Sequence, residues 1–464
     1  MENVKGKIRM ATANSQGSEE KISLLEKFAY GMGDFWTSIV FTILSAYLLV
    51  FYVDVMKIPA AMVGSVMLVV RLLDGVTDLG IGALVDRTKT KHGKARPWLL
   101  WGGVPFGLSL MLLFYVPDFG LRGQLIYIFF TYFLITTVYS AVNIPYGALN
   151  ALITKDSYEK TVLNIFRMTS AYVGGVVIHS IAMPLINSFD QVRTGWFVTF
   201  ALVGVLIPLG YGFTFYFTKE RVKPSISKKN SKITLKRELN ALIRNKFWVI
   251  LVILSLFTWL NSGITNGLNA FMATTVLGDS NLIGVLGNIG LVPLIIGVPL
   301  MAPVIKRFGK RNAVFMGALL TIPASLVFLI DPTNPNLLFL SVALRAFASV
   351  PGAAAMNPML TDTIDYGEWK FGIRSEGLVF SASSFGMKVG VGLGSAAMGG
   401  ILALANYNAN LATQSDFTIT ALVNAYVWIP IVLAICQLIL LSMYKLDPLH
   451  EGIVRELDEV AEMS

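Results

Sequence analysis

Apolar residues gather along this chain into about twelve segments, which are separated by short polar stretches. Each segment approaches or exceeds the roughly 20 residues that a helix needs to cross the hydrocarbon core of a bilayer. Glycine and proline are spread through these segments, which membrane helices tolerate because neighbouring helices satisfy the freed backbone groups. The segments lie at roughly 26–53, 60–85, 98–117, 124–153, 162–187, 196–218, 247–277, 282–305, 313–331, 337–360, 376–405 and 418–444. The pattern predicts an all-α membrane protein with twelve transmembrane helices.

Composition supports this prediction. Of the 464 residues, 55% are hydrophobic and 14% are charged, and the mean hydropathy is +0.65. A soluble domain rarely has such a composition. The single cysteine, Cys436, lies in the last apolar segment and is expected to pack as a small hydrophobic residue. The first 25 residues are polar and contain no short apolar core, so we expect no cleaved signal peptide.

Positive charge alternates from loop to loop. The net charge of +9 comes largely from basic loops at 86–97, 219–246 and 306–311. The only basic residues in the intervening loops, near 118–123, 188–195, 278–281, 332–336 and 406–417, are Arg122 and Arg193. Because cytoplasmic loops carry the excess of Lys and Arg, both termini are predicted to be cytoplasmic. This distribution also argues against a nucleic-acid partner.

The long basic loop divides the spans into two sets of six. The predicted organisation is a cytoplasmic N-terminal segment (1–25), a first six-helix half (26–218), a central cytoplasmic loop (219–246), a second six-helix half (247–444) and a cytoplasmic tail (445–464). Apolar residues at helical spacing predict a short amphipathic helix in the tail.

Two short matches indicate that the halves repeat one another. NALIT at 150–154 matches NPMLT at 357–361, and HGKAR at 92–96 matches FGKRN at 308–312. Parallel six-helix repeats, with a substrate site between them near the bilayer midplane, are the architecture of the major facilitator fold.

Three ionisable residues interrupt the second apolar segment. Arg71, Asp74 and Asp78 are spaced by three and four, which places them on one face of a helix. A charge at the bilayer centre costs at least about 2.5 to 3.5 kcal/mol, so such carboxylates usually mark an ion, proton or substrate path. Two carboxylates one turn apart can share a small cation, or one of them can hold a proton. A structural alternative is that Arg71 merely neutralises Asp74.

Several segments resemble the glycoside-pentoside-hexuronide cation symporters of the major facilitator superfamily. They occur in the family's order over nearly the whole chain, and they are YGMGD at 30–34, YLLVFYVDV at 47–55, LVVRLLDGVTD at 68–78, GALVDRTKTKHGKARPW at 82–98, NIPYGAL at 143–149 and DTIDYGEWKFGIRSEG at 362–377. The resemblance implies uptake of a sugar or glycoside, driven by sodium or proton entry, through a multi-pass protein of the plasma or inner membrane.

The resemblance also implies a cation site. In the melibiose-transporting relatives, the positions that match Asp74, Thr77, Asp78 and Ser140 line that site, so Na⁺ at Asp74 and Asp78 is one expectation. Thr77 departs from the asparagine of those relatives, which leaves Na⁺ and H⁺ as alternatives.

For the sugar, the resemblance places Arg167 and Lys388 in the substrate and coupling region. Arg and Lys can bind hydroxyls or a carboxylate, whereas the structural alternative is that Lys388 pairs with Asp74 or Asp78. Asp34 is expected either at the edge of the cavity or as an anchor of the first helix.

Differences from the melibiose carriers indicate which branch of the family this chain resembles. Those relatives have carboxylates at the positions matching Ser38 and Asn143, and a Trp at the position matching Gly147. This chain is closer to the glucuronide and pentoside branch, in which Asn143 offers a donor and an acceptor to a sugar hydroxyl. Tyr30, Tyr146 and Trp259 are candidates to stack on the sugar ring, although packing is the commoner role of membrane aromatics.

Charges next to the predicted cytoplasmic ends form a further expected group. We expect ion pairs between the halves that exist only when the cytoplasmic side is closed, because alternating access needs a bistable contact. The residues concerned are Asp86, Arg87, Gly93, Lys94 and Arg96 in the first half, with Asp365, Glu368, Arg374 and Glu376 in the second.

Other functions remain as alternatives. A carrier of lysolipids would share the fold but would want an apolar slot in place of Asn143, Arg167 and Lys388. A non-transporting membrane sensor is the other alternative. A membrane enzyme is not expected, because paired-aspartate metal sites need more carboxylates than DGVTD supplies. We expect no cofactor other than the coupling ion, and the expected partners are a small sugar, a monovalent cation and the lipid bilayer.

Overall fold

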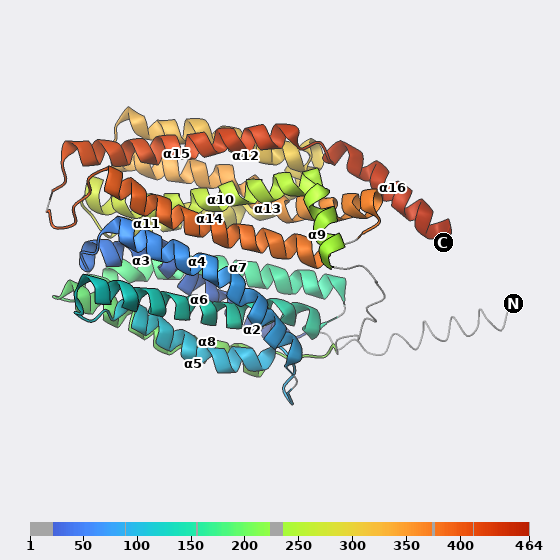
Figure 1. The fold of residues 1–464 in the computed structure, drawn as a ribbon, viewed down its shortest axis with the longest axis horizontal. Helices are drawn as coiled ribbons and strands as arrows, with labels where there is room; N and C mark the ends of the chain where they lie inside the picture. Colours follow the sequence, from blue (N-terminus) through green and yellow to red (C-terminus); the bar gives the residue numbers. More distant parts are fainter. Residues whose placement is uncertain are drawn as a thin grey trace.

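The computed structural model is almost entirely helical. It describes residues 22–88, 90–154, 156–222, 235–373, 376–411 and 413–463. Within these residues, twelve helices are long and apolar enough to cross a membrane. They lie roughly parallel to one another in an elongated bundle (Figure 1). The prediction of twelve transmembrane helices in an all-α protein is confirmed.

The first six spans are built from nine helical segments. They are α2 (Leu24–Thr42), η1 (Ile43–Tyr47), α3 (Leu48–Val50) and η2 (Phe51–Val55), which together form the first span, then α4 (Ala60–Arg87), α5 (Arg96–Phe114), α6 (Gly120–Ile153), α7 (Ser157–Ile186) and α8 (Val192–Phe217).

The second six spans follow after a short helix that precedes them. The segments are α9 (Leu235–Arg244), α10 (Lys246–Phe271) continued by η3 (Met272–Val276), α11 (Leu282–Phe308), α12 (Lys310–Leu326) continued by η4 (Val327–Ile330), α13 (Pro335–Phe371), α14 (Glu376–Leu404), α15 (Asp416–Met443) and α16 (Asp447–Met463).

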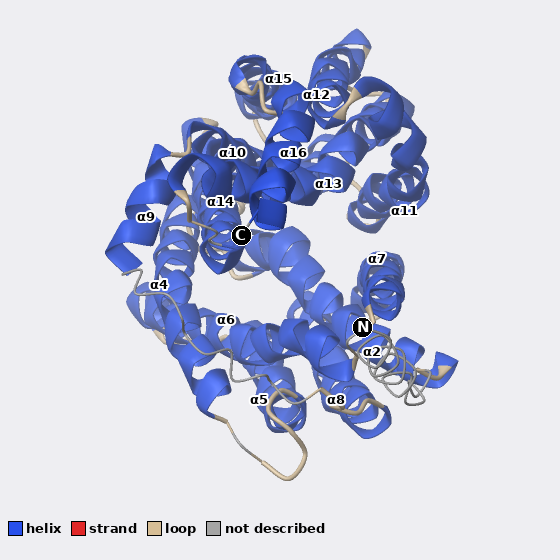
Figure 2. Ribbon diagram, turned by 90° about the vertical axis from the view of Figure 1, so that its right-hand side faces the viewer, coloured by secondary structure: helices blue, strands red, loops and turns tan. Residues whose placement is uncertain are grey.

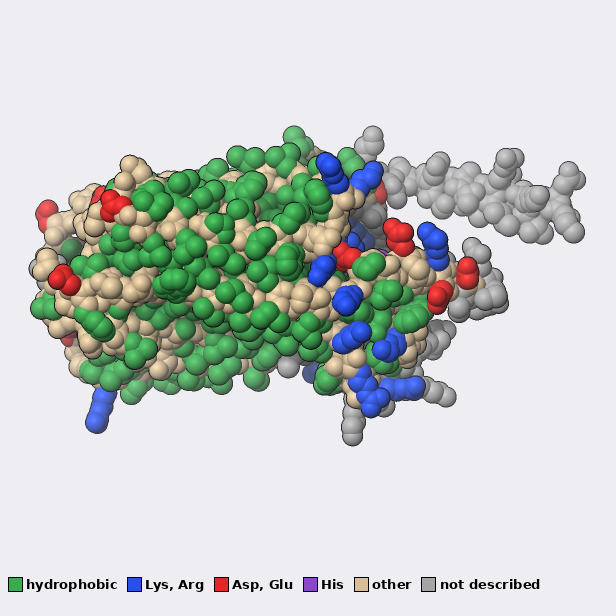
Figure 3. Space-filling view, turned by 90° about the horizontal axis from the view of Figure 1, so that it is seen from above, with side chains coloured by type: hydrophobic (Ala, Val, Ile, Leu, Met, Phe, Trp, Pro, Cys, Tyr) green, Lys and Arg blue, Asp and Glu red, His purple; other side chains and the backbone are tan. Residues whose placement is uncertain are grey.

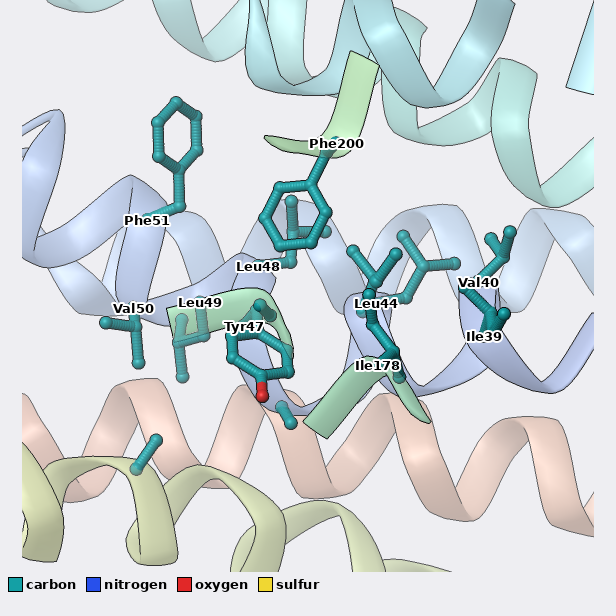
Figure 4. Close-up of a cluster of buried hydrophobic side chains, with 14 of the residues drawn as sticks. Ile39, Val40, Leu44, Tyr47, Leu48, Leu49, Val50, Phe51, Ile178 and Phe200 are labelled. Carbon is teal, nitrogen blue, oxygen red and sulfur yellow. The ribbon is translucent and has the colours of Figure 1, made fainter. Parts of the chain in front are cut away.

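The first span is the most deeply buried. Its residues Tyr47 and Phe51 are surrounded by side chains of neighbouring spans, among them Ile178 of α7 and Phe200 of α8 (Figure 4). Two π-helical turns, η1 and η2, interrupt this span, and such turns often occur at functional sites.

The spans form two groups, which contact each other along two seams. Helices α2–α8 pack mainly among themselves, as do α10–α15. Between the groups, α4 packs against α14 and α7 packs against α11, as the view along the bundle shows (Figure 2). Glycines allow the close approach: Gly64 faces the backbone of Ala396, and Gly399 faces that of Ala60.

Charge separates the two ends of the bundle. One face of the molecule is covered by hydrophobic side chains along its length, and Lys and Arg gather toward one end (Figure 3). We call this the basic end; it holds the loop between α4 and α5, the end of α8 and helix α16. The opposite end holds the connection between η2 and α4, at 56–59, and the connection between α14 and α15. The positive-inside rule predicts that the basic end is cytoplasmic.

Two helices differ from the sequence expectations. Part of the predicted central loop forms α9, whose Leu242 is buried in a cluster with Phe247 and Ile364; this apolar contact explains why the polar segment is ordered as a helix. Helix α13 continues to Phe371, beyond the predicted end near 360, and stops where Gly372 adopts φ +63°. The predicted helix in the tail is confirmed as α16.

Candidate functional site

Two carboxylates from the first half meet an ammonium group from the second. Asp74 and Asp78 lie one turn apart on α4, and Lys388 reaches them from α14. Its Nζ lies 2.9 Å from Oδ2 of Asp74 and also contacts Oδ2 of Asp78. Asp74 is 1% exposed. This ion-pair cluster therefore joins the two halves along the α4–α14 seam.

Ser140 of α6 completes the cluster. Lys388 Nζ donates a hydrogen bond of 3.0 Å to its Oγ, and that hydroxyl donates to Oδ1 of Asp74 at 3.3 Å. Oδ1 of Asp78 is buried and has no hydrogen-bond partner among the described residues. The two carboxylates and the Lys388 ammonium sum to −1, and the Arg71 guanidinium, 3.9 Å from Asp74, brings the local sum to zero.

Arg71 is a more distant partner of Asp74 than expected if it alone neutralised that carboxylate. Its guanidinium lies 3.9 Å from Oδ2 of Asp74 and packs over the ring of Tyr132. Lys388 is closer to Asp74, so the pairing of Lys388 with both aspartates is confirmed. The hydroxyl of Thr77 donates to the backbone carbonyl of Asp74 at 2.9 Å. In this structure the Thr77 hydroxyl therefore bonds to the backbone of its own helix.

A second ion pair lies within the first half. Arg167 of α7 places Nε 2.7 Å from Oδ2 of Asp34 on α2, and their side chains are 27% and 14% exposed. The guanidinium also packs over the ring of Tyr146 from α6. Asp34 thus ties the first span to the fifth, and it remains partly accessible. Both roles expected for it are compatible with this geometry.

Helix α6 links the two ion pairs. Ser140, Asn143 and Tyr146 recur every three residues, so they follow one face of the helix. The six steps from Ser140 to Tyr146 span about 9 Å at 1.5 Å per residue. Asn143 lies between them and is half-buried, as is Ser38, one turn beyond Asp34 on α2. We call Ser140, Asn143 and Tyr146 the polar strip of α6.

Tyr30 and Tyr146 have the packing role that is the commoner one for aromatic residues of a membrane bundle. Both rings are fully buried and stack on each other with centroids 5.0 Å apart. The Tyr146 hydroxyl donates to the backbone carbonyl of Tyr30 at 2.6 Å. Their aromatic faces are therefore used in packing. Trp259 on α10 is half-buried and keeps its place as a candidate.

The basic loop is held by Glu220, a residue that the sequence did not single out. Its carboxylate accepts hydrogen bonds of 2.8 to 2.9 Å from the backbone N–H groups of Lys94, Ala95 and Arg96. The Arg96 guanidinium donates to the carbonyl of Phe215 at 2.6 Å. All these partners belong to the first half. The backbone of Lys94, Ala95 and Arg96, together with the Arg96 side chain, thus anchors α5 to the end of α8.

In the second half, Asp365 lies 3.0 Å from Nε2 of His450 on α16, and Lys310 pairs with Asp362 at 2.5 Å. These partners again belong to one half. Arg87 is exposed, Glu368 has a partner, and Arg374 lies outside the described residues. The side chains of Asp86 and Glu376 are also outside the description. Ion pairs that form between the halves when the basic end closes stay a prediction.

Polar contacts between the halves occur at the opposite end. The Tyr407 hydroxyl donates to Oδ1 of Asp54 at 2.6 Å, and Asn288 donates to Ser180 at 2.9 Å. Burial and the Asp54 carboxylate raise the pKa of Tyr407 above its ordinary value, so Tyr407 is the donor. Lys57 Nζ donates to the carbonyl of Ala409. This end is closed in the structure.

The same contact region contains backbone strain. Lys57 and Asn406 are the non-glycine residues with positive φ in the described chain, at 58° and 54°. They lie on the two sides of the contact between Asp54 and Tyr407. Residues held in this left-handed region often cluster at ligand clamps and switch regions.

Arg345 is a buried cation that the sequence expectations left out, although a charge in an apolar segment is the signal for one. Its guanidinium packs 4.1 Å over the ring of Tyr426 and donates weakly to that residue's carbonyl. It lies between α13 and α15, within the second half.

Comparisons with known proteins identify the family of the chain. The model of the family "MFS/sugar transport protein" matches residues 29–448. The isoprimeverose transporter of Lactiplantibacillus pentosus is 34% identical over 442 residues, covering 94% of this chain and 91% of that protein. The inner membrane symporter YicJ of Escherichia coli (strain K12) is 32% identical over 428 residues, covering 90% of each. The glucuronide carrier protein homolog of the same strain is 28% identical, covering 92% of this chain and 94% of that protein.

Solved structures show the same fold at low identity. The nucleoside transporter NupG superposes with a TM-score of 0.60 at 14% identity, covering 90% of this chain and 99% of that one. A bacterial homologue of the human lysosomal transporter Spinster, in an inward-facing and unoccupied conformation, superposes with a TM-score of 0.61 at 15% identity, covering 95% and 98%. The chain belongs to the MFS/sugar transport protein family.

Proposed function

We propose that this protein imports a sugar or glycoside, such as a pentoside, a glucuronide or a related oligosaccharide, together with Na⁺ or H⁺. The observation that carries the proposal is the cluster of Asp74, Asp78, Lys388 and Ser140. It places a cation-accepting pair of carboxylates on the seam between the halves, where binding can affect how the halves pack. In this proposal the protein is a transporter without a cofactor or catalytic step.

The cluster supplies a chemistry that can couple the ion to the sugar. Lys388 occupies the carboxylate oxygens that a coupling ion would use, so Na⁺ binding or protonation competes with Lys388 for Asp74 and Asp78. The unpartnered Oδ1 of Asp78 offers a first oxygen to an incoming cation. Once displaced, the ammonium of Lys388 becomes a donor for a sugar hydroxyl. Cation and sugar affinities would then rise together by the same factor, because coupling between binding sites is reciprocal.

The sugar would lie along α6, between the cluster and the Asp34–Arg167 pair. Asn143 lies in the middle of this strip, and Ser38 borders it. The relatives support a sugar-type substrate, since one is an isoprimeverose transporter and another is a glucuronide carrier homologue. The inner-membrane relative and the basic end together support a cell-membrane location with cytoplasmic termini.

During the transport cycle, the site would be open first to one end of the bundle and then to the other. The contacts of Asp54 with Tyr407 and of Ser180 with Asn288 close the opposite end in the present state. Opening that end requires these contacts to break and new ones to form at the basic end, as rigid-body rocking of the halves provides. The charges of the basic loop are our candidates for the new contacts.

The test is uptake by purified protein in liposomes with an imposed Na⁺ or pH gradient. Asp74→Asn should abolish concentrative uptake, because the amide cannot balance a cation, while the protein still inserts and elutes as a single species. Asp118→Asn, which changes an exposed carboxylate far from the site, is the matched control and should retain uptake. Undiminished accumulation by Asp74→Asn would contradict the proposal.

Counterflow against xylosides, glucuronides and galactosides, with and without Na⁺ and across pH, would identify the sugar class and the coupling ion. Arg167→Ala and Lys388→Ala should each weaken sugar binding. Normal sugar binding in both variants would remove their proposed role. Exchange of a lysolipid in place of every sugar would favour the lysolipid alternative.

A further inference from the structure

Helix α9 differs from the spans in its direction. It runs across the ends of the neighbouring spans at the basic end, not along them, and it lies at the rim of the bundle (Figure 1 and Figure 2). The change of direction occurs at Asn245, which leaves the helical conformation with φ −77° and ψ 92° and accepts from the N–H of Trp248 to begin α10. The apolar span of α10 starts at Lys246. Helix α9 therefore ends where the membrane begins, and it lies along the membrane surface.

One face of α9 is fixed to the second half of the protein. Leu242 is buried in a cluster with Phe247 of α10 and Ile364 of α13. The side-chain amide of Asn245 donates to the backbone carbonyl of Thr363 on α13 at 2.8 Å. These contacts join α9 to the first turn of α10 and to the last turns of α13. They hold α9 in one orientation, so the direction of its other faces is fixed as well.

The rest of the α9 surface carries apolar and basic side chains on different faces. Leu239 and Ile243, one turn apart, are 42% and 67% exposed. Arg237 and Arg244 are also exposed, and they lie about 130° around the helix axis from the apolar pair, at roughly 100° per residue. Among the described residues, no carboxylate pairs with either arginine. Lys246, at the start of α10, adds a further exposed cation.

These two faces match the boundary between acyl chains and headgroups. Leu239 and Ile243 would leave water by entering the acyl region, while the arginines stay at the level of the phosphates. Amphipathic helices with a basic polar face bind membrane surfaces in this way. A soluble protein partner matches the site less well, because the apolar face lies next to the first turn of a membrane span, where lipid is already present.

We propose that α9 is a membrane-surface helix that binds the headgroups of anionic phospholipids through Arg237, Arg244 and Lys246. A guanidinium can hold a phosphate with two parallel hydrogen bonds, and Lys or Arg near an anionic surface adds electrostatic attraction. Because α9 is fixed to α10 and α13, the bound lipid also stabilises the packing of these two spans at the basic end. This surface is separate from the cation and sugar site, so lipid binding does not depend on the proposed transport.

The first test identifies the face of α9 that meets lipid. In a Cys436→Ser background, a nitrobenzoxadiazole label is placed at Leu239→Cys or at Asn240→Cys, two exposed neighbours whose side chains point about 100° apart. In liposomes that contain phosphatidylglycerol, the label at 239 should emit at shorter wavelength. Lipids brominated on their acyl chains should quench it severalfold more than the label at 240. Equal quenching would mean that the apolar face is open to water, as expected for the site of a protein partner, and it would overturn the proposal.

The second test measures the effect of headgroup charge. The thermal unfolding midpoint of the wild-type protein in neutral detergent is titrated with phosphatidylglycerol, phosphatidylcholine or inorganic phosphate, and we expect a saturable rise with phosphatidylglycerol alone. In Arg237→Gln with Arg244→Gln, the phosphatidylglycerol concentration that gives half of this rise should increase about tenfold or more. The charge-matched control, Lys91→Gln with Arg455→Gln, removes two exposed cations elsewhere at the basic end and should keep the wild-type concentration.

Three results of this titration would contradict lipid binding by α9. Equal rises with phosphatidylglycerol and phosphatidylcholine would show that headgroup charge has no effect. An equal rise with inorganic phosphate would indicate a site for soluble anions. A wild-type titration curve in the α9 double variant would place the lipid elsewhere. The comparison of the three additives uses only the wild-type protein, so it decides the role of headgroup charge even if a variant fails to fold.

Discussion

At the residue scale, Glu220 and Gly93 explain the form of the basic loop. Helix α5 has no capping side chain of its own, so the Glu220 carboxylate accepts from the N–H groups at its beginning, which have no partner within the helix. Gly93 adopts φ +105°, and a Cβ there would overlap the same carboxylate. Glycine is therefore required at this position for two independent reasons, one conformational and one steric.

Glu220→Ala should lower stability by roughly 1 to 2 kcal/mol, because three buried or half-buried N–H groups lose their acceptor. The change would be measured as a lower melting temperature of the protein in detergent. Gly93→Ala should act through the same contact, so the double variant should be little worse than the worse single one. Fully additive effects would show that Gly93 and Glu220 stabilise the loop separately. Glu451→Ala, at an exposed position on α16, is the control.

At the scale of the elements, small residues set how closely the helices approach. Gly107 of α5 and Gly204 of α8 face each other so that a Cβ on either one would meet the other's backbone carbonyl. In lipid the hydrophobic effect does not drive helices together, so close backbone packing of this kind supplies much of the association. The apolar pattern of α5 predicts a span, but it does not reveal which helix α5 meets.

Gly107→Val should separate α5 from α8 and destabilise the protein by about 1 to 3 kcal/mol, the usual cost of overpacking. The expected result is a melting temperature in detergent several degrees lower, with lower yield of correctly inserted protein. Gly212→Ala is the matched control, because nothing lies within 4 Å of a Cβ at that glycine of α8. If both variants melt at the wild-type temperature, close packing of α5 on α8 does not stabilise the bundle.

At the scale of the whole molecule, the two halves are joined by few polar contacts, and these are unevenly placed. Lys388 joins them near the centre, while Asp54–Tyr407 and Ser180–Asn288 join them at the opposite end. Asn187, at the end of α7, also donates to Ser280 and Asn281 before α11, and small residues pack along the seams between these contacts. Such an interface can separate at one end while it remains closed at the other, which is what an alternating-access cycle requires.

A cysteine pair at Ser180 and Asn288 should lock the opposite end. With Cys436 replaced by Ser, Ser180→Cys with Asn288→Cys should form a disulfide on oxidation, since the native side chains lie 2.9 Å apart. Sugar uptake should fall to background and return after reduction. Each single cysteine variant should be insensitive to the oxidant. Wild-type uptake by the fully cross-linked protein would show that this contact does not open during transport.

The sequence by itself determined the twelve spans, the basic end and the residues that carry charge into the membrane. The reason is that the bilayer imposes a strong and local requirement: a long apolar segment, satisfied backbone groups and a high cost for each buried charge. Those constraints act on each segment separately, so they can be read without knowing how the spans pack.

Only the tertiary structure decided which charges meet. Lys388 lies 310 residues from Asp78 and 314 from Asp74 along the chain (388 − 78 and 388 − 74), and Arg167 lies 133 residues from Asp34, its partner. The burial of Tyr30 against Tyr146 and the capping of α5 by Glu220 were equally hidden. Pairing between distant spans depends on how helices are arranged around one another, and the apolar pattern of each span is compatible with many such arrangements.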